Sequence, residues 1–180
     1  MSLFSIGGGA GTGKTTVCDI LKARGYDAYD IDSAGFARWK NTETGYIHPK
    51  SSVKAEDRTP DFLKLHDWHV AREVVEQLRD KAIGHTVFLC GDIGYKSDFS
   101  DLFDGVFALQ VDDETLEHRL ATRTENDWGK QPHELLLSIN ANRSSYNAYR
   151  DIGATIVDAT QPAESVVDEI LSLINTDIPA

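Results

Sequence analysis

Cysteine, proline and long apolar runs are all scarce in this sequence. Its 180 residues include two cysteines, Cys18 and Cys90, and five prolines. Cys18 falls in an expected helix and Cys90 at the end of an apolar run, so we expect a reducing compartment and two buried small hydrophobic side chains, not a disulfide framework. No run of about 18 apolar residues occurs, so no membrane span is expected. Residues 1–6 lack the basic and long apolar parts of a signal peptide, and we therefore expect a cytoplasmic protein.

Positive charge is also scarce. The chain has 18 Lys and Arg against 29 Asp and Glu, which gives a formal net charge of −11. A nucleic-acid surface needs clustered Lys and Arg, so nucleic acid is not an expected partner. A small anionic ligand is still compatible, because the charge of a pocket can oppose that of the whole chain. The length and the 41% hydrophobic content fit residues 1–180 forming a single domain.

Short apolar runs and helical patterns alternate along the chain. Strands are expected at residues 3–6, 26–31, 86–90, 106–111 and 154–158, and helices at 14–24, 60–84, 113–123, 132–150 and 162–174. The helix over 60–84 is predicted from Thr59-Pro60 at its start, Gly84 at its end and the apolar residues Leu63, Ala71, Val74, Val75 and Leu78 between them. Alternating strands and helices predict an α/β fold with three α/β/α layers and a five-stranded parallel sheet.

The most specific motif is the run Gly8-Gly9-Ala10-Gly11-Thr12-Gly13-Lys14-Thr15, which fits the P-loop pattern. An apolar run precedes it and a helix that includes Thr16 follows it, as that pattern requires. Glycines let backbone N–H groups turn around phosphate oxygens, and the helix N-terminus adds further donors. Lys14 is expected to reach the β- and γ-phosphates, and Thr15 to ligate the metal. The predicted ligands are a nucleoside triphosphate, ATP, and Mg²⁺.

A P-loop does not by itself name a reaction. The base-reading Asn-Lys-x-Asp run of GTPases does not occur in the sequence. Motor and AAA-type ATPases usually need a longer chain and a strand that ends in Asp-Glu. The run Val111-Asp112-Asp113-Glu114 is the nearest match, but it lies just before a helix, where Asp112 or Asp113 serves better as a cap.

The P-loop and the order of elements resemble the small P-loop kinases of the nucleoside-monophosphate-kinase fold, which include adenylate, shikimate and gluconate kinases. The resemblance covers the whole chain and is specific at the P-loop. It implies a short lid at about residues 122–133 and an acceptor-binding region at about 33–70. The Phe-Arg-x-x-Glu run of shikimate kinases and the Arg-x-Asp-Asp lid of many adenylate kinases are missing, so the acceptor stays open.

Acidic residues follow two of the expected strands. Asp30 and Asp32 lie on one side of the second strand, at the carboxyl edge where open α/β sheets bind ligands. The resemblance implies that Asp32 is the general base or acceptor anchor and that Asp30 lies in the outer shell of Mg²⁺. Solvated turn residues are the alternative. In Cys90-Gly91-Asp92-Ile93-Gly94, Gly91 would admit substrate to the backbone and Asp92 would order the Mg²⁺ waters, unless the run is an ordinary turn.

Arginines mark the expected lid. Arg119 and Arg123 share a helix face and lead into the polar run 124–130. The resemblance implies that they clamp the transferring phosphoryl group, with Arg143 pointing into the same site. A salt-bridged helix surface is the alternative for all three. Gln161 lies in the loop after the last strand, which by resemblance lies against adenine, and Thr160 there would cap the next helix.

The acceptor region offers Arg38 and Arg58 as its arginines. Trp39 or Trp68 would suit stacking on a base or sugar, although a tryptophan on an amphipathic helix is more often a core residue. The histidines lack the spacing of metal ligands. We expect a phosphotransferase acting on a small metabolite, slightly favouring a nucleoside or nucleotide. The alternative is a regulatory or accessory NTPase that hydrolyses ATP slowly without a small-molecule acceptor.

Overall fold

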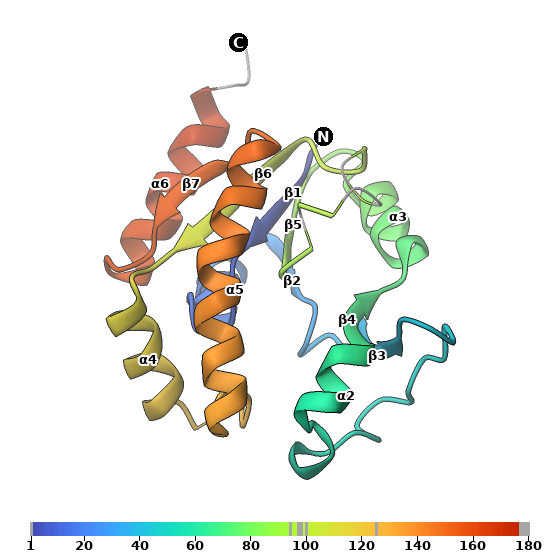
Figure 1. Ribbon diagram of the computed structural model, residues 1–180. Helices are drawn as coiled ribbons and strands as arrows, with labels where there is room; N and C mark the ends of the chain where they lie inside the picture. The colour runs from blue at the N-terminus through green and yellow to red at the C-terminus, as the bar shows by residue number, and fades with distance from the viewer. Residues whose placement is uncertain (1, 94, 97–98, 100, 125, 177–180) are drawn as a thin grey trace.

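A five-stranded parallel sheet forms the centre of the computed structural model (Figure 1), which describes residues 2–93, 95–96, 99, 101–124 and 126–176. The strand order is β2-β5-β1-β6-β7. The strands are β1 (Ser2–Gly7), β2 (Asp27–Asp30), β5 (Thr86–Cys90), β6 (Gly105–Gln110) and β7 (Thr155–Asp158). All four neighbouring pairs are parallel, which confirms the predicted sheet.

Helices cover both faces of this sheet, so the three predicted layers are confirmed. One face carries α1 (Lys14–Ala23) and α6 (Ala163–Thr176), and the other carries α3 (Arg72–Lys81) and α5 (Pro132–Asp151). Alternation along β5 explains the division, because successive side chains point to opposite faces. Val87 and Leu89 pack in the cluster that holds Val75 of α3, whereas Phe88 packs with Val17 of α1.

Local signals set the ends of several helices. Asp112 precedes α4 (Asp113–Thr122), and its side chain accepts a hydrogen bond from the Thr115 N–H at 2.7 Å. Asp112 is therefore a helix cap, as the sequence indicated. Pro132 begins α5, where its missing N–H leaves no helical bond unmade. Both cysteines are buried free thiols, in line with their expected role as small hydrophobic residues.

The single helix predicted over residues 60–84 is wrong. The chain instead forms α2 (Pro60–Leu65), β4 (His66–Val70) and α3. Strand β4 pairs antiparallel with β3 (Ala37–Asn41), which lies in the stretch of residues that gave no clear sequence pattern. The physical reason is that the positions three and four residues after Leu63 are the polar His66 and Asp67, which interrupt the apolar helical face, so pairing with β3 is favoured there. The Thr59 cap is real, because its hydroxyl accepts from the Phe62 N–H.

The central strand leads directly into the phosphate-binding motif. Strand β1 lies between β5 and β6, and residues 8–13 follow it at the carboxyl edge of the sheet. Elements β3, β4 and α2 lie together below the sheet in Figure 1, with a short 3₁₀ helix (Ala55–Asp57) in the loop before α2. No helix within the described ranges has the length and hydropathy needed to cross a membrane.

Candidate phosphate-binding and transfer site

The P-loop folds as a tight turn that needs its glycines. Gly8, Gly11 and Gly13 have φ values of 134°, 87° and 102°. A Cβ on Gly8 would also lie 2.6 Å from the Leu109 carbonyl oxygen, so the strain and the contact both exclude side chains there. Helix α1 starts at Lys14, and its first N–H groups have no carbonyl four residues back within the helix. This geometry forms an anion-binding site.

Lys14 lies over the loop that it follows. Its Nζ donates to the carbonyl oxygens of Gly8 and Gly9 at 2.7 and 2.8 Å. The Thr12 hydroxyl also donates to the Gly9 carbonyl, at 2.9 Å, and closes the turn. The lysine ammonium is therefore held beside the anion-binding N–H groups, where a phosphate oxygen would find both.

Thr15 and Asp30 meet beside the loop and form a pair of oxygen donors. The Thr15 hydroxyl donates to Asp30 Oδ2 at 2.8 Å, and the backbone N–H groups of Asp32 and Ser33 donate to Asp30 Oδ1 at 3.0 and 2.9 Å. Asp30 is only 4% exposed, so its carboxylate is fixed. A hydroxyl and a carboxylate are hard ligands that suit Mg²⁺, and the Thr15 oxygen can ligate a metal while its hydroxyl hydrogen still donates to Asp30. These two residues therefore fit the expected metal.

Strand β2 ends at Asp30, so Asp32 lies in the turn after the strand and not on the predicted strand alternation. The indole N–H of Trp68 donates to its Oδ1 at 2.7 Å. Although part of Asp32 is open to solvent, desolvation by surrounding protein raises the pKa of its carboxyl. The Trp68 hydrogen bond and the positive charge of Lys14 oppose that rise in pKa, the charge of Asp30 adds to it, and that of Arg123 opposes it. Asp32 thus feels charges from the P-loop and from the lid side at once.

Asp92 is tied to the P-loop through Tyr149, a residue that sequence reasoning missed. The Tyr149 hydroxyl donates to Asp92 Oδ1 at 2.8 Å, and burial and the charge of Asp92 raise the pKa of Tyr149, which keeps the hydroxyl protonated. A Cβ on Gly7 would lie 1.9 Å from that hydroxyl oxygen. Gly91 is also tightly packed, since a Cβ there would lie 2.6 Å from the Ile31 side chain. Gly94 of the same predicted motif lies outside the described residues.

The two arginines of the predicted lid face take different places. Arg119 Nη2 donates to the Ala159 carbonyl at 2.8 Å and its Nη1 to the Thr12 carbonyl at 3.3 Å. It therefore joins the P-loop to the loop after β7. In that second loop, Gln161 donates to Glu169 at 2.8 Å. Thr160 donates through its hydroxyl to Asp158 at 2.6 Å, and α6 begins three residues after it, at Ala163.

Arg123 ends α4 and lies at the start of the lid segment. Its Nη2 donates to the Trp128 carbonyl, and its charge acts on Asp32. Arg123 is thus placed between the lid and the predicted general base. Glu125, which belongs to the predicted lid, lies outside the described residues.

The predicted acceptor region and the C-terminal end of the predicted lid are joined by a buried ion pair that the sequence did not indicate. Arg58 Nε donates to Glu134 Oε1 at 2.7 Å, and Arg58 Nη2 donates to Asp127 at 3.1 Å. Glu134 is fully buried, and its second oxygen accepts from the Gly129 N–H at 2.9 Å. Arg58 also lies over the Trp128 ring, 5.6 Å from its centroid. These contacts hold residues 127–134 against the acceptor region.

The two remaining arginines of the predicted site, Arg38 and Arg143, bind other partners, and for Arg143 the alternative of a salt-bridged helix surface holds. Arg38 donates to the carbonyl oxygens of Gly35 and Ala37, both close to it in the chain. Arg143 Nε pairs with Asp113 Oδ2 at 3.0 Å on an exposed surface between α5 and α4. Neither arginine makes a recorded contact with the P-loop, Asp30 or Asp32 within the part of the chain that the structure describes.

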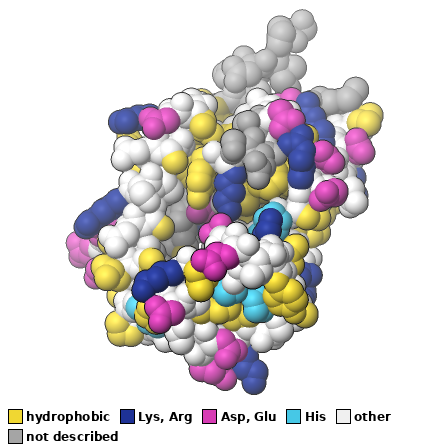
Figure 2. Space-filling view, turned by 45° about the vertical axis from the view of Figure 1, so that its right-hand side comes forward, with side chains coloured by type: hydrophobic (Ala, Val, Ile, Leu, Met, Phe, Trp, Pro, Cys, Tyr) yellow, Lys and Arg dark blue, Asp and Glu magenta, His cyan; other side chains and the backbone are white. Residues whose placement is uncertain are grey.

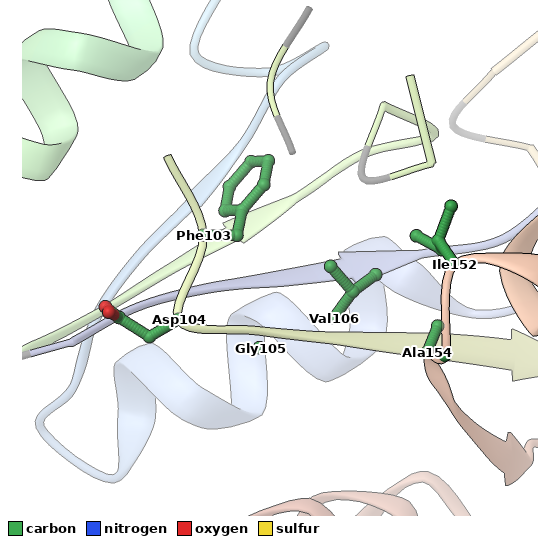
Figure 3. A pocket seen from close by; sticks show the side chains of 7 residues that line it. Phe103, Asp104, Gly105, Val106, Ile152 and Ala154 are labelled. Atoms are coloured by element: carbon green, nitrogen blue, oxygen red, sulfur yellow. The ribbon is translucent and has the colours of Figure 1, made fainter. Parts of the chain in front are cut away.

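A separate surface hollow lies at the opposite edge of the sheet (Figure 3). It is lined by residues at the start of β6 and before β7, namely Phe103, Asp104, Gly105, Val106, Ile152, Gly153 and Ala154. The P-loop follows the carboxyl end of β1, whereas this hollow adjoins the amino ends of the parallel strands β6 and β7. Its one acidic side chain, Asp104, accepts hydrogen bonds from Arg79 and the Leu3 N–H. The hollow is therefore separate from the phosphate site.

A P-loop at the end of the central strand of a five-stranded parallel sheet, followed by Asp30, defines a nucleotide-binding domain of the P-loop class. Residues 5–144 match the family described as "AAA domain", and the chain belongs to that family. The sequence lacks a strand that ends in Asp-Glu, and this had spoken against an AAA-type protein. The match over residues 5–144 shows that the chain nevertheless belongs to this family. No match was found among curated proteins.

Solved structures that are similar to the chain share this fold. One is a shikimate kinase from Acinetobacter baumannii in complex with shikimate, at 13% identity and a TM-score of 0.61, with coverage of 100% of this chain and 96% of that one. A gluconokinase from Sinorhizobium meliloti 1021 has 19% identity, a TM-score of 0.58 and coverage of 97% and 92%. A deoxyadenosine kinase from M. mycoides with bound dATP has 15% identity, a TM-score of 0.53 and coverage of 96% and 99%. The fold resemblance inferred from the sequence is thereby confirmed.

Proposed function

We propose that the protein is an ATP- and Mg²⁺-dependent phosphotransferase that moves the γ-phosphate to a hydroxyl of a small molecule, with a nucleoside or nucleotide favoured. The observation that carries this proposal is the position of Asp32. Its carboxylate is held by Trp68 and feels the charges of Lys14 and Arg123. A carboxylate at this place can accept the proton of an acceptor hydroxyl that attacks the γ-phosphate, and its Trp68 contact puts it beside the aromatic part of the predicted acceptor region. The folds of the three kinases support the same reading.

Asp32 is proposed as the general base and acceptor anchor. It takes the proton of the acceptor hydroxyl as that oxygen forms a bond to the γ-phosphorus. The bond between the γ-phosphorus and the β–γ bridging oxygen breaks, and ADP leaves with that electron pair. Lys14 and Arg123 face the charge that develops on the transferring group, and Arg119 holds the nucleotide side of the loop.

Thr15 and Asp30 are proposed to hold Mg²⁺, with Asp92 ordering its water shell from the Tyr149 side. When bound, the ion neutralises charge on the β- and γ-phosphate oxygens. Residues 122–133 are proposed to act as the lid and residues 33–70 as the acceptor region of one domain. Closure of such a lid excludes the water that would otherwise accept the phosphate.

The decisive experiment compares ATP consumption with and without acceptors. Nucleosides, nucleotides, sugar acids and shikimate-like compounds are offered with ATP and Mg²⁺, and phosphorylated product is measured by mass spectrometry. Formation of a phosphorylated acceptor supports the proposal. Slow ADP formation that no acceptor changes would instead favour a regulatory or accessory NTPase.

A further inference from the structure

All three tryptophans of the chain belong to one cluster. Trp39 on β3 lies opposite Trp68 on β4, with ring centroids 5.0 Å apart. Trp128 comes from the lid segment, and its ring lies 6.0 Å from that of Trp39. We call Trp39, Trp68 and Trp128 the tryptophan cluster. Three segments distant in sequence thus bring their largest aromatic rings to one place.

The tryptophan cluster is packed against Phe62, yet its rings keep exposed surface. Phe62 packs against Trp39 with ring centroids 5.5 Å apart and stacks on His66 at 3.8 Å with planes 6° apart. Trp68 is 37% exposed, and Trp39 and Trp128 are half-buried. On the face in Figure 2, hydrophobic and histidine side chains lie side by side in the lower part. Rings that are held rigidly yet keep accessible surface can stack on a flat ligand.

One hydrogen bond joins the tryptophan cluster to the proposed reaction centre. The Trp68 indole N–H donates to Asp32 Oδ1 at 2.7 Å. Among the described residues, none donates a hydrogen bond to Asp32 Oδ2, so this oxygen is left to accept one from a ligand hydroxyl. A ligand bound through Asp32 would therefore lie within reach of the rings.

Both arginines of the predicted acceptor region already donate hydrogen bonds to oxygen atoms of the protein. Arg58 is bound by Glu134 and Asp127, and Arg38 donates to the carbonyl oxygens of Gly35 and Ala37. Recognition of a ligand carboxylate or phosphate usually takes an arginine whose paired N–H groups face the ligand. Here the two arginines of residues 33–70 face protein acceptors instead. This arrangement favours an acceptor without a charged group.

We infer that the acceptor of the proposed phosphotransfer is an uncharged nucleoside, with its base against the tryptophan cluster and a sugar hydroxyl at Asp32, and not a nucleoside monophosphate or a sugar acid. The inference rests on the proposed function, since it names the acceptor of that same site. It assigns specificity to ring stacking at Trp39 and Trp68, and to the binding of Arg38 and Arg58 by protein oxygens.

An acceptor panel tests the class of ligand. Adenosine, cytidine and thymidine are compared with AMP, CMP, gluconate and shikimate at fixed ATP and Mg²⁺, and kcat/KM is measured for each. At least one nucleoside is expected to exceed every anionic compound by about 10-fold or more. A higher kcat/KM for a monophosphate or an acid would overturn the inference and leave phosphotransfer intact. If none of the compounds is phosphorylated, the proposed function is refuted.

Tryptophan fluorescence tests the binding site independently of turnover, because every tryptophan of the chain lies in the cluster. Saturable quenching by a nucleoside, with no quenching by gluconate, is expected with a non-hydrolysable ATP analogue bound. Quenching without product would retain the nucleoside site while refuting transfer. No quenching by any nucleoside would overturn the inference.

Substitutions at Trp39 separate stacking from folding. Trp39→Leu is expected to raise KM for the nucleoside on the order of 10-fold, because stacking of a base on an aromatic ring contributes roughly 1–3 kcal/mol. Trp39→Phe should restore most of that loss. Tyr46→Leu serves as the control, since Tyr46 is 57% exposed and its ring contacts His48. Equal KM values in Trp39→Leu and Tyr46→Leu, with ATP affinity and far-UV circular dichroism unchanged, would contradict a stacking role.

Discussion

Replacing Glu134 with alanine should destabilise the fold through the contact between the acceptor region and the lid. The substitution removes a fully buried carboxylate whose two oxygens accept hydrogen bonds from Arg58 and from the Gly129 N–H. Both donors then lose this acceptor, and Arg58 is only 8% exposed. Loss of one partner from a buried ion pair costs about 3–5 kcal/mol. Asp127 stays near Arg58 and is exposed, so we take the lower value of about 3 kcal/mol. For a chain of this size, that corresponds to a fall in Tm of roughly 6–12 °C.

Differential scanning calorimetry with a matched control decides this prediction. Arg143→Ala removes an exposed ion pair from the same helix, with Asp113 as the partner, and should cost at most about 1 kcal/mol. Glu134→Gln keeps an oxygen for the Gly129 N–H and should fall between the two. If Glu134→Ala lowers Tm no more than Arg143→Ala, the buried pair does not stabilise the fold and the reasoning is wrong.

Three further predictions concern the phosphate site. Lys14→Ala should weaken ATP binding in calorimetry and lower kcat together, and an effect on only one of them would count against its assigned place. Asp32→Asn should lower kcat by about 10²–10⁴ with ATP affinity kept. The acid limb of kcat/KM should lie above the ordinary aspartate pKa of about 4, because burial raises the pKa of Asp32, and it should vanish in the variant. Gly7→Ala should destabilise by roughly 1–3 kcal/mol in denaturant unfolding, since its Cβ would meet the Tyr149 hydroxyl, and a neutral result would refute that packing.

The raised pKa of Asp32 also predicts the direction in which the stability of the fold changes with pH. A carboxyl whose pKa is raised by folding stabilises the fold below its unfolded pKa, and this contribution is lost as pH rises through the folded pKa. At pH 7 Asp32 is ionised, so this stabilisation of the fold by its protonated form is absent. Asp32→Asn should leave Tm at pH 7 unchanged or raised while activity falls, and a clear drop in Tm would contradict the assignment.

The sheet and the phosphate loop were predictable because their signals are local. Each buried strand is a short apolar run, and the spacing from Gly8 to Thr15 depends on backbone geometry within one turn. Asp30 was also predictable as a neighbour of Thr15, because β1 and β2 are parallel strands of one sheet and their carboxyl ends share an edge.

The acceptor side was not predictable for the opposite reason. Strand β4 exists because it pairs with β3, about thirty residues earlier by the Trp39–Trp68 register, and no local pattern in residues 66–70 specifies a strand. Arg58 and Glu134 are 76 residues apart, so their ion pair has no sequence signal. The conspicuous tryptophans were noticed, and the alternative that Trp68 is a core residue of an amphipathic helix is wrong, since Trp68 lies on β4 and is 37% exposed.

Helix α5 contacts the phosphate loop through one of its turns and the predicted lid segment through another. Glu134 lies in its first turn, and Tyr149, fifteen residues later, packs against Gly7 and binds Asp92. At 1.5 Å per residue, these two contacts are about 22 Å apart along the axis. The helix contains no glycine, and its one proline is at its start, so it has no built-in hinge. In the proposed enzyme, a straight α5 would therefore carry a shift of the lid segment at Glu134 to the contact between Tyr149 and Gly7.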